Sequence, residues 1–190
     1  MIRLRNTLAT LGVATLAMVP LGVVSSVLVP AASGAPARTH QIAIARLFSG
    51  NAQVELREHF AGEAVLAGLV GTNAANLRDA ITGETYEHTT MYPGFARQAT
   101  KDKCLGAAKL FTEIAGDEGG HAAAFRTALR SLTNPKVKVP RPPKVSPVVI
   151  TASKPACPGT RTQDNLLTAM HGEAFANAKY TAYAAQATRS

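Results

Sequence analysis

The sequence has 190 residues, of which 46% are hydrophobic and only 5% aromatic, and it contains no tryptophan. This length is enough for one modest core and a targeting segment. The formal net charge is +8, but the basic excess lies in two stretches, at Arg3 and Arg5 and in the acid-free segment 134–161. Because the rest of the chain is balanced, the charge argues against a nucleic-acid-binding face.

Residues 1–34 predict a secretory signal peptide. Arg3 and Arg5 precede an apolar run at 8–29, and the small residues of "PAASGAPA" suit a cleavage site. The apolar run is long for a signal peptide, so an uncleaved leader would anchor the protein in a membrane. We therefore expect the folded part, residues 38–190, to be secreted or otherwise extracytoplasmic, or anchored to the membrane.

Four segments after the leader have apolar residues at helical spacing and are rich in Ala, Leu, Glu and Arg. They are residues 41–68, 73–100, 103–133 and 162–188. Residues 134–161 are Pro-rich and predict an extended linker. With no convincing sheet, the pattern predicts an all-α four-helix bundle in which this linker is one long connection.

Two internal repeats relate these helices in pairs. A shift of 89 positions places "NLRDAITGE" on "NLLTAMHGE" and aligns Glu84 with Glu173. A shift of 63 positions places the first helix on the third without a gap and aligns Glu55 with Glu118. The bundle is thus predicted to consist of two related helix pairs.

The candidate metal ligands come from these repeated helices. Glu84 and Glu87 are three residues apart and share a helix face, and so do Glu118 and His121. A carboxylate facing a bundle core is expected to be paired or to bind metal. One glutamate from each of two helices, with Glu-x-x-His motifs from the other two, is the ligand pattern of di-iron and di-manganese bundle sites. Such ligands suit Fe or Mn.

The first helix leaves one ligand open. At the position equivalent to His121 stands Glu58, and His59 follows it. The ungapped alignment favours Glu58 as the ligand, whereas a local shift of the helix would bring His59 inward instead. Both alternatives remain at this point.

Two adjacent glycines, Gly119 and Gly120, interrupt the third helix between Glu118 and His121. Each costs a helix interior up to about 1 kcal/mol relative to alanine. We interpret them as tolerated because metal ligation would stabilise that turn. Substituting both with alanine is then expected to stabilise the metal-free protein.

The two cysteines, Cys104 and Cys157, form no Cys-x-x-Cys pair. This sequence therefore encodes no iron–thiolate or zinc-ribbon module. Export permits a disulfide between the two residues, but whether they meet stays open.

Long stretches of the sequence resemble the rubrerythrins, a family of ferritin-like di-iron carboxylate proteins. "NLRDAITGETYEHTTMYPGFA" and "AAKLFTEIAGDEGGHAAAF" resemble the third and fourth helices of that family. "GTRTQDNLLTAMHGEAFANAKYTAYAAQA" resembles the first helix, and "IARLFSGNAQVELREHF" resembles the second. The resemblance thus implies a circularly permuted ferritin-like bundle, with the linker as the new connection. The linker could span a bundle of about 30–40 Å, or deliver the last helix to a neighbouring chain in a swapped homodimer.

The resemblance also implies a function. It implies a non-haem protein with two Fe ions, or Mn, that reduces hydrogen peroxide or oxidises ferrous iron. The implied ligands are Glu55, Glu58, Glu84, Glu87, Glu118, His121 and Glu173. Tyr180 would lie near the metals and hydrogen-bond a ligand. The cysteines of a rubredoxin module are absent, which implies an external electron donor. The alternatives are a metal-sequestering protein without turnover and a metal-free helical interaction module.

Overall fold

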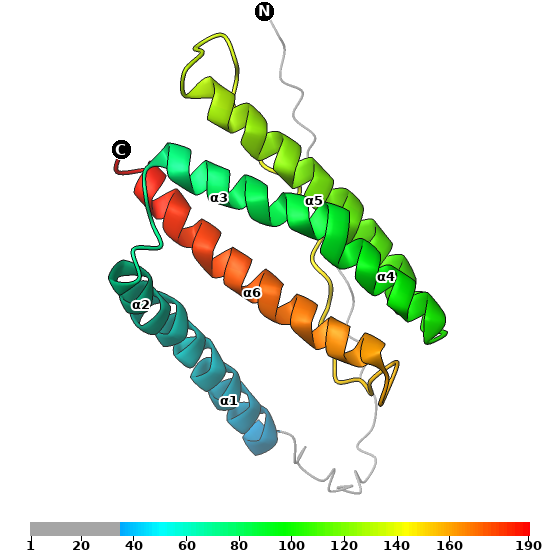
Figure 1. The fold of residues 1–190 in the computed structure, drawn as a ribbon. Coiled ribbons are helices and arrows are strands. Elements are labelled where there is room, and N and C mark those ends of the chain that lie inside the picture. The colour runs from blue at the N-terminus through cyan, green and yellow to red at the C-terminus, as the bar shows by residue number, and fades with distance from the viewer. Residues whose placement is uncertain (1–34) are drawn as a thin grey trace, which may run out of the picture. The chain divides into compact units, whose positions relative to one another are not determined.

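The computed structural model describes residues 35–190 (Figure 1), and the predicted leader lies outside these residues. Within the described part, the regular elements are all helical and there is no strand, as predicted. No helix among these residues combines the length and apolarity needed to cross a membrane. The unit Arg46–Ser190 contains the bundle, and the residues up to Ala45 belong to a separate unit.

Each predicted helical segment is helical in the structure, and two of them contain a π turn. The first segment consists of α1 (Ala35–Val54), the π turn η1 (Glu55–His59) and α2 (Phe60–Leu66). The second consists of α3 (Asn73–Tyr86), the π turn η2 (Glu87–Met91) and α4 (Tyr92–Lys101). The third and fourth are α5 (Leu105–Ser131) and α6 (Arg161–Ala187).

The helices α5 and α6 both pack on α3 and α4, and much less on each other. Figure 1 shows that α3 and α4 run opposite to both α5 and α6. Tyr92, Ala99, Phe111 and Ala169 form the buried core between them. These helices occupy three corners of a four-helix bundle. Two cavities lined by residues of α5 and α6 form a groove between those two helices.

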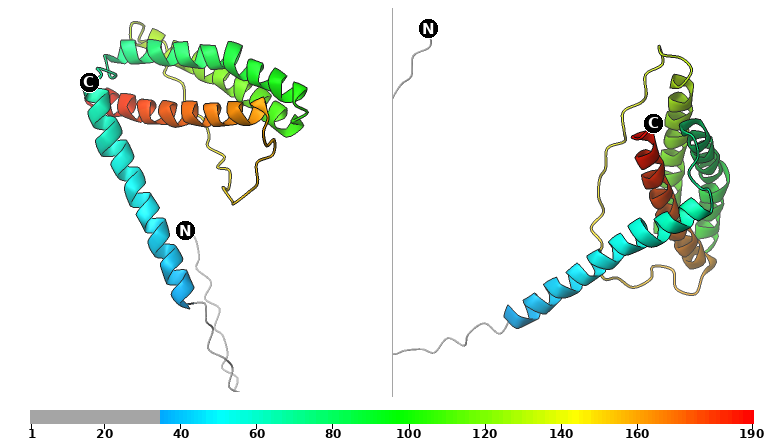
Figure 2. Two further views of the ribbon diagram at one scale, coloured as in Figure 1. Left: turned by 60° about the horizontal axis from the view of Figure 1, so that its bottom comes forward. Right: turned by 90° about the vertical axis from the view of Figure 1, so that its left-hand side faces the viewer.

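The linker 132–160 follows the bundle from the end of α5 to the start of α6 (Figure 2). Its residues 141–156 are exposed, and within the described chain residues 138–156 make no hydrogen bond. Val139 and Pro143 line cavities between α5 and α6. The linker therefore lies over part of the groove without hydrogen bonds from residues 138–156.

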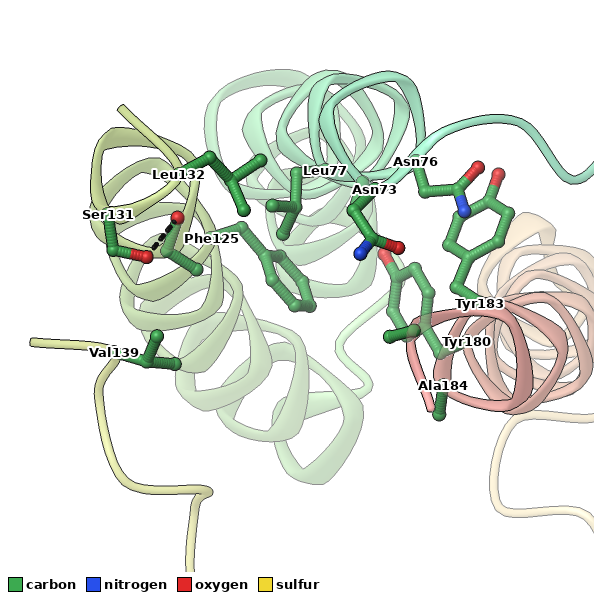
Figure 3. Close-up of a pocket in the computed structure, with 13 residues that line it drawn as sticks. Asn73, Asn76, Leu77, Phe125, Ser131, Leu132, Val139, Tyr180, Tyr183 and Ala184 are labelled. Atoms are coloured by element: carbon green, nitrogen blue, oxygen red, sulfur yellow. Dashed lines mark hydrogen bonds between the residues drawn. The ribbon is translucent and has the colours of Figure 1, made fainter. Parts of the chain in front are cut away.

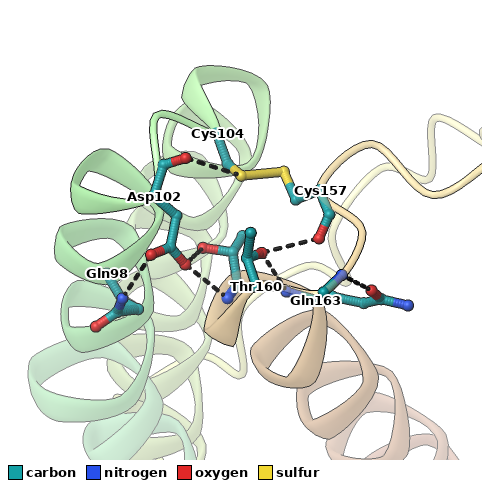
Figure 4. The surroundings of a disulfide bond; sticks show 8 residues. Gln98, Asp102, Cys104, Cys157, Thr160 and Gln163 are labelled. Carbon is teal, nitrogen blue, oxygen red and sulfur yellow. Dashed lines mark hydrogen bonds between the residues drawn. A yellow bond between two sulfur atoms is a disulfide. The ribbon is translucent and has the colours of Figure 1, made fainter.

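The start of α6 is tied to the turn between α4 and α5 (Figure 4). Cys104 and Cys157 form a disulfide with their Cα atoms 6.1 Å apart. Beside it, Asp102 Oδ2 accepts hydrogen bonds from the Thr162 backbone N–H at 2.9 Å and from Thr162 Oγ1 at 2.7 Å. Gln98 Nε2 donates to Asp102 Oδ1 at 2.9 Å. Asp102 thus caps the N-terminus of another helix.

Replacing Asp102 with asparagine is expected to lower stability at neutral pH. The hydrogen bond from the Thr162 hydroxyl is the main cause that lowers the pKa of Asp102. A lowered folded-state pKa stabilises the protein above the unfolded value of about 3.9, and this stabilisation disappears as the pH falls through the folded value. Urea denaturation of Asp102→Asn should therefore differ from wild type at pH 7 and converge with it in acid. Asp117→Asn, an exposed site on α5, is the control, and an equal effect there would contradict the cap.

Candidate metal centre

Three predicted ligands meet in the middle of the bundle. Glu84 from α3 and Glu118 and His121 from α5 each offer a ligand atom, and these atoms lie within 4.8 Å of one another. His121 Nδ1 is 2.6 Å from Glu118 Oε2 and 3.4 Å from Glu84 Oε2. The side chains of Glu84 and Glu118 are only 3% and 8% exposed. All three residues are among the candidate ligands predicted from the sequence.

Two further predicted ligands face the same space. A cavity of about 540 Å³ between α5 and α6 is lined by Glu84, Glu118 and His121, and also by Glu87 from η2 and Glu173 from α6. Glu173 is more exposed than the buried pair because it lies on the open side of the bundle. The cavity thus collects carboxylates from three helices around one histidine.

Two tyrosines hold these carboxylates from opposite helices. The Tyr180 hydroxyl donates to Glu84 Oε1 at 2.6 Å, as expected for a residue near the site. The Tyr92 hydroxyl donates to Glu173 Oε1. Glu84 and its repeat counterpart Glu173 therefore each accept a hydrogen bond from a tyrosine of the other repeat. Burial, followed by these hydrogen bonds, raises the pKa of both tyrosines, which keeps them protonated as donors.

The π turn η2 explains why sequence reasoning missed Tyr92. The repeat of 89 positions pairs Tyr180 with Met91. A π turn holds one extra residue, and beyond η2 the repeat becomes 88 positions and pairs Tyr92 with Tyr180. The change of the repeat from 89 to 88 positions is the sequence feature that could have identified Tyr92. It also pairs Phe95 with Tyr183.

The π turn η1 has the same effect in the first helix. Beyond it, the repeat changes from 63 to 62 positions and pairs His59 with His121. His59 Nδ1 lies 3.0 Å from Glu55 Oε2, which reproduces the contact between His121 and Glu118. The structure thus favours His59 over Glu58 as the counterpart of His121. None of these first-helix residues lines the cavity, so Glu55 and Glu58 as ligands stay predictions.

The electrostatics of the cluster favour a bound cation. Burial and the charges of Glu84 and Glu173 raise the pKa of Glu87 to about 7. Burial, and then the neighbouring carboxylate of Glu84, raises the pKa of Glu118. The buried Glu84 Oε2 has no hydrogen-bond partner among the described residues. Since a buried carboxylate oxygen without a partner is costly, this donor set fits an Fe or Mn ion.

The structure corrects the interpretation of Gly119. A Cβ atom there would lie 2.8 Å from the ring of His88, whose Nδ1 is 2.6 Å from the carbonyl oxygen of Ala115. A Cβ atom at Gly120 would meet nothing within 4 Å. The close packing of His88 against α5 therefore explains the glycine at position 119. Metal ligation is not needed to explain it.

Alanine at the two glycines is expected to have opposite effects. Gly120→Ala should stabilise the metal-free protein by up to about 1 kcal/mol through helix propensity. Gly119→Ala should destabilise it by about 1–2 kcal/mol, because His88 must leave its place on α5. Urea denaturation of the two variants measures this difference. Equal stabilisation by both would show that His88 moves without cost.

Comparison with known proteins gives a consistent picture. The family model named Rubrerythrin matches residues 37–129. A rubrerythrin of Porphyromonas gingivalis is 38% identical over 63 residues, which cover 33% of this chain and 32% of that protein. A rubrerythrin of Nitratidesulfovibrio vulgaris is 35% identical over 71 residues, or 37% of each chain. The chain thus spans about a third of the length of these relatives. No solved structure matches it.

Proposed function

This chain belongs to the rubrerythrin family, and we propose that it is a non-haem di-iron protein that reduces hydrogen peroxide. The observation that carries the proposal is the buried cluster of Glu84, Glu118 and His121 with its unpartnered carboxylate oxygen. The matched range ends before α6, so the resemblance of α6 to the family's first helix and the permuted helix order remain predictions.

The residues of the cavity have separate roles in this proposal. Those that would hold the metals are Glu84, Glu87, Glu118, His121 and Glu173. When bound, two iron ions would supply the two electrons and the Lewis acidity that cleavage of peroxide requires. Tyr180 and Tyr92 orient the carboxylates of Glu84 and Glu173 through their hydroxyl groups. The cavity of about 540 Å³ leaves room for peroxide beside these side chains.

Oxidation of ferrous iron is the second candidate activity. The same cavity is rich in carboxylates and lies at the surface between α5 and α6, so a ferrous ion could enter it as substrate. With Mn as the resident metal, or without turnover, the protein would instead sequester metal.

We also propose that the folded part is extracytoplasmic, secreted or anchored by its leader. The disulfide between Cys104 and Cys157 supports this proposal, because stable disulfides are typical of oxidising compartments. Since both cysteines are engaged in it, turnover would need an external electron donor.

Iron reconstitution tests the function. We expect the full-length protein, loaded anaerobically with ferrous iron, to retain two iron ions per carboxylate cluster and to consume peroxide. His121→Ala should lose both properties, whereas His171→Ala, an exposed site on α6, should keep them. Iron retention without peroxide consumption or ferrous oxidation would indicate sequestration. A folded wild-type protein that retains no metal would contradict the proposal and favour an interaction module.

A further inference from the structure

The linker 132–160 is held at both ends and exposed between them. At one end α5 stops at Ser131, and Val139 lines the apolar cavity of about 320 Å³ between α5 and α6 (Figure 3). At the other end Cys157 is 7% exposed and is fixed by its disulfide with Cys104. Residues 141–156 lie between these two attachments, and all of them are exposed. The middle of the linker is therefore presented to its surroundings as a loop.

This loop carries four aliphatic residues within six positions, the aliphatic cluster. They are Val145, Val148, Val149 and Ile150. Their exposed fractions are 85%, 86%, 84% and 95%, so they contact almost nothing in their own chain. Single exposed apolar residues are common on proteins, whereas a contiguous exposed group indicates an interaction site. The aliphatic cluster is therefore a candidate contact surface.

Positive charge surrounds the aliphatic cluster. Residues 134–161 contain no acidic residue and six basic ones, which are Lys136, Lys138, Arg141, Lys144, Lys154 and Arg161. Lys138, Arg141 and Lys154 are exposed, and none of the three forms an ion pair within the described residues. The charge of the loop is therefore complementary to an anionic surface.

The residue types of the loop distinguish between two anionic partners. Residues 134–161 contain no Phe, Tyr, Trp or His, the residues that stack on the bases of nucleic acids. The side chains among the cations are aliphatic instead. Aliphatic side chains enter the boundary of the acyl region of a bilayer, while Lys and Arg are attracted to anionic headgroups. The loop therefore fits an anionic lipid surface better than a nucleic acid.

The backbone of the loop limits how deeply it can enter a bilayer. Residues 138–156 make no hydrogen bond within the described chain, so their exposed N–H and C=O groups depend on water. Such groups cannot lose that water in the hydrocarbon core without a large cost. Pro140, Pro142, Pro143 and Pro147 have no N–H group to dehydrate. The loop is thus suited to the interface of one leaflet and not to crossing a membrane.

We propose that the linker is a membrane-binding loop, whose aliphatic cluster enters the interface of an anionic bilayer while the Lys and Arg side chains around it bind the headgroups. The loop would hold the bundle against the lipid surface whether or not the leader is cleaved. With a cleaved leader, it would be the contact that keeps the bundle there. The inference does not depend on a bound metal.

A single tryptophan in the loop tests this insertion. The sequence contains no tryptophan, so Val149→Trp introduces a unique fluorophore into the aliphatic cluster. We expect its emission to shift to the blue when the full-length protein is mixed with vesicles of phosphatidylcholine and phosphatidylglycerol, and not with phosphatidylcholine alone. Tyr86→Trp, at a 55% exposed site on α3, is the matched control and should not shift. Both variants carry the leader, so the difference between them reports on the loop.

Removing charge from the loop tests the headgroup contacts. The loop variant adds Lys138→Gln, Arg141→Gln and Lys154→Gln to Val149→Trp. We expect the lipid concentration at half of the emission shift to rise by about 100-fold at low salt, since each Lys or Arg near an anionic surface contributes about fivefold. The control variant instead removes three exposed cations of α3 and α4, with Arg78→Gln, Arg97→Gln and Lys101→Gln. It should change this concentration much less.

Three results would overturn the proposal. The first is an emission of the Val149→Trp variant that the anionic vesicles leave unchanged. The second is vesicle binding that depends on the loop charges without a blue shift, which would indicate a purely electrostatic site for polyanions. The third is a blue shift that appears without vesicles and grows with protein concentration, which would indicate that the linker pairs with a second copy.

Discussion

Glu118→Gln is expected to stabilise the metal-free protein and at the same time to weaken its metal binding strongly. In the metal-free state the Glu118 carboxyl is buried beside Glu84, and its pKa is raised by burial. A neutral amide of the same shape relieves this unfavourable environment, by about 1–3 kcal/mol. The amide is a poor ligand for iron, so affinity should fall by at least about 100-fold, the upper end of the loss for residues that only orient a ligand.

Two measurements on the same samples check that stability rises while iron affinity falls. Urea denaturation of the metal-free protein gives the change in stability, and iron titration gives the change in affinity. Glu113→Gln is a matched control, because Glu113 lies on the same helix in an exposed pair with Lys109. A variant that loses stability while keeping its metal would show that Glu118 is a structural residue.

The helices and the carboxylate cluster could be predicted because both follow from regular spacing. Apolar periodicity located the four helical segments, and ligands three residues apart necessarily share a face. The repeats related α3 to α6 and thereby indicated that Glu84 and Glu173 would face the same space, as they do in the cavity. No tertiary contact was needed for these steps.

The π turns could not be predicted, since no local propensity distinguishes an extra residue in one helical turn from a regular turn. Both occur where a ligand motif lies, at Glu55–His59 and at Glu87–Met91. Without them, Tyr92 has no role and His59 remains an alternative to Glu58. Gly119 was misinterpreted for a related reason. Its neighbour His88 is remote in sequence and comes close only because α3 and η2 pack on α5.

Loss of the disulfide is expected to have the largest effect on stability. Cys104 and Cys157 are 53 residues apart, and closing a loop of this size removes about 4 kcal/mol of chain entropy from the unfolded state. Measured effects of native disulfides are typically 2–4 kcal/mol, so we expect a loss in that range for Cys104→Ser with Cys157→Ser. The linker makes no hydrogen bonds over 138–156 in the described chain. Without the disulfide, α6 is held by Asp102, by its polar contacts with α3 and α4 and by helix packing.

Urea denaturation with and without reductant measures this effect, and the double variant should show no further response to reductant. A change below about 0.5 kcal/mol would mean that Asp102, the polar contacts of α6 with α3 and α4, and the packing of α6 suffice. The same bond also tests the swapped homodimer predicted from the sequence. If α6 were delivered to a neighbouring chain, the disulfide would link two copies, and a non-reducing denaturing gel would show a dimer. With α6 packed in its own chain, the disulfide closes a loop within one chain and the gel should show a monomer.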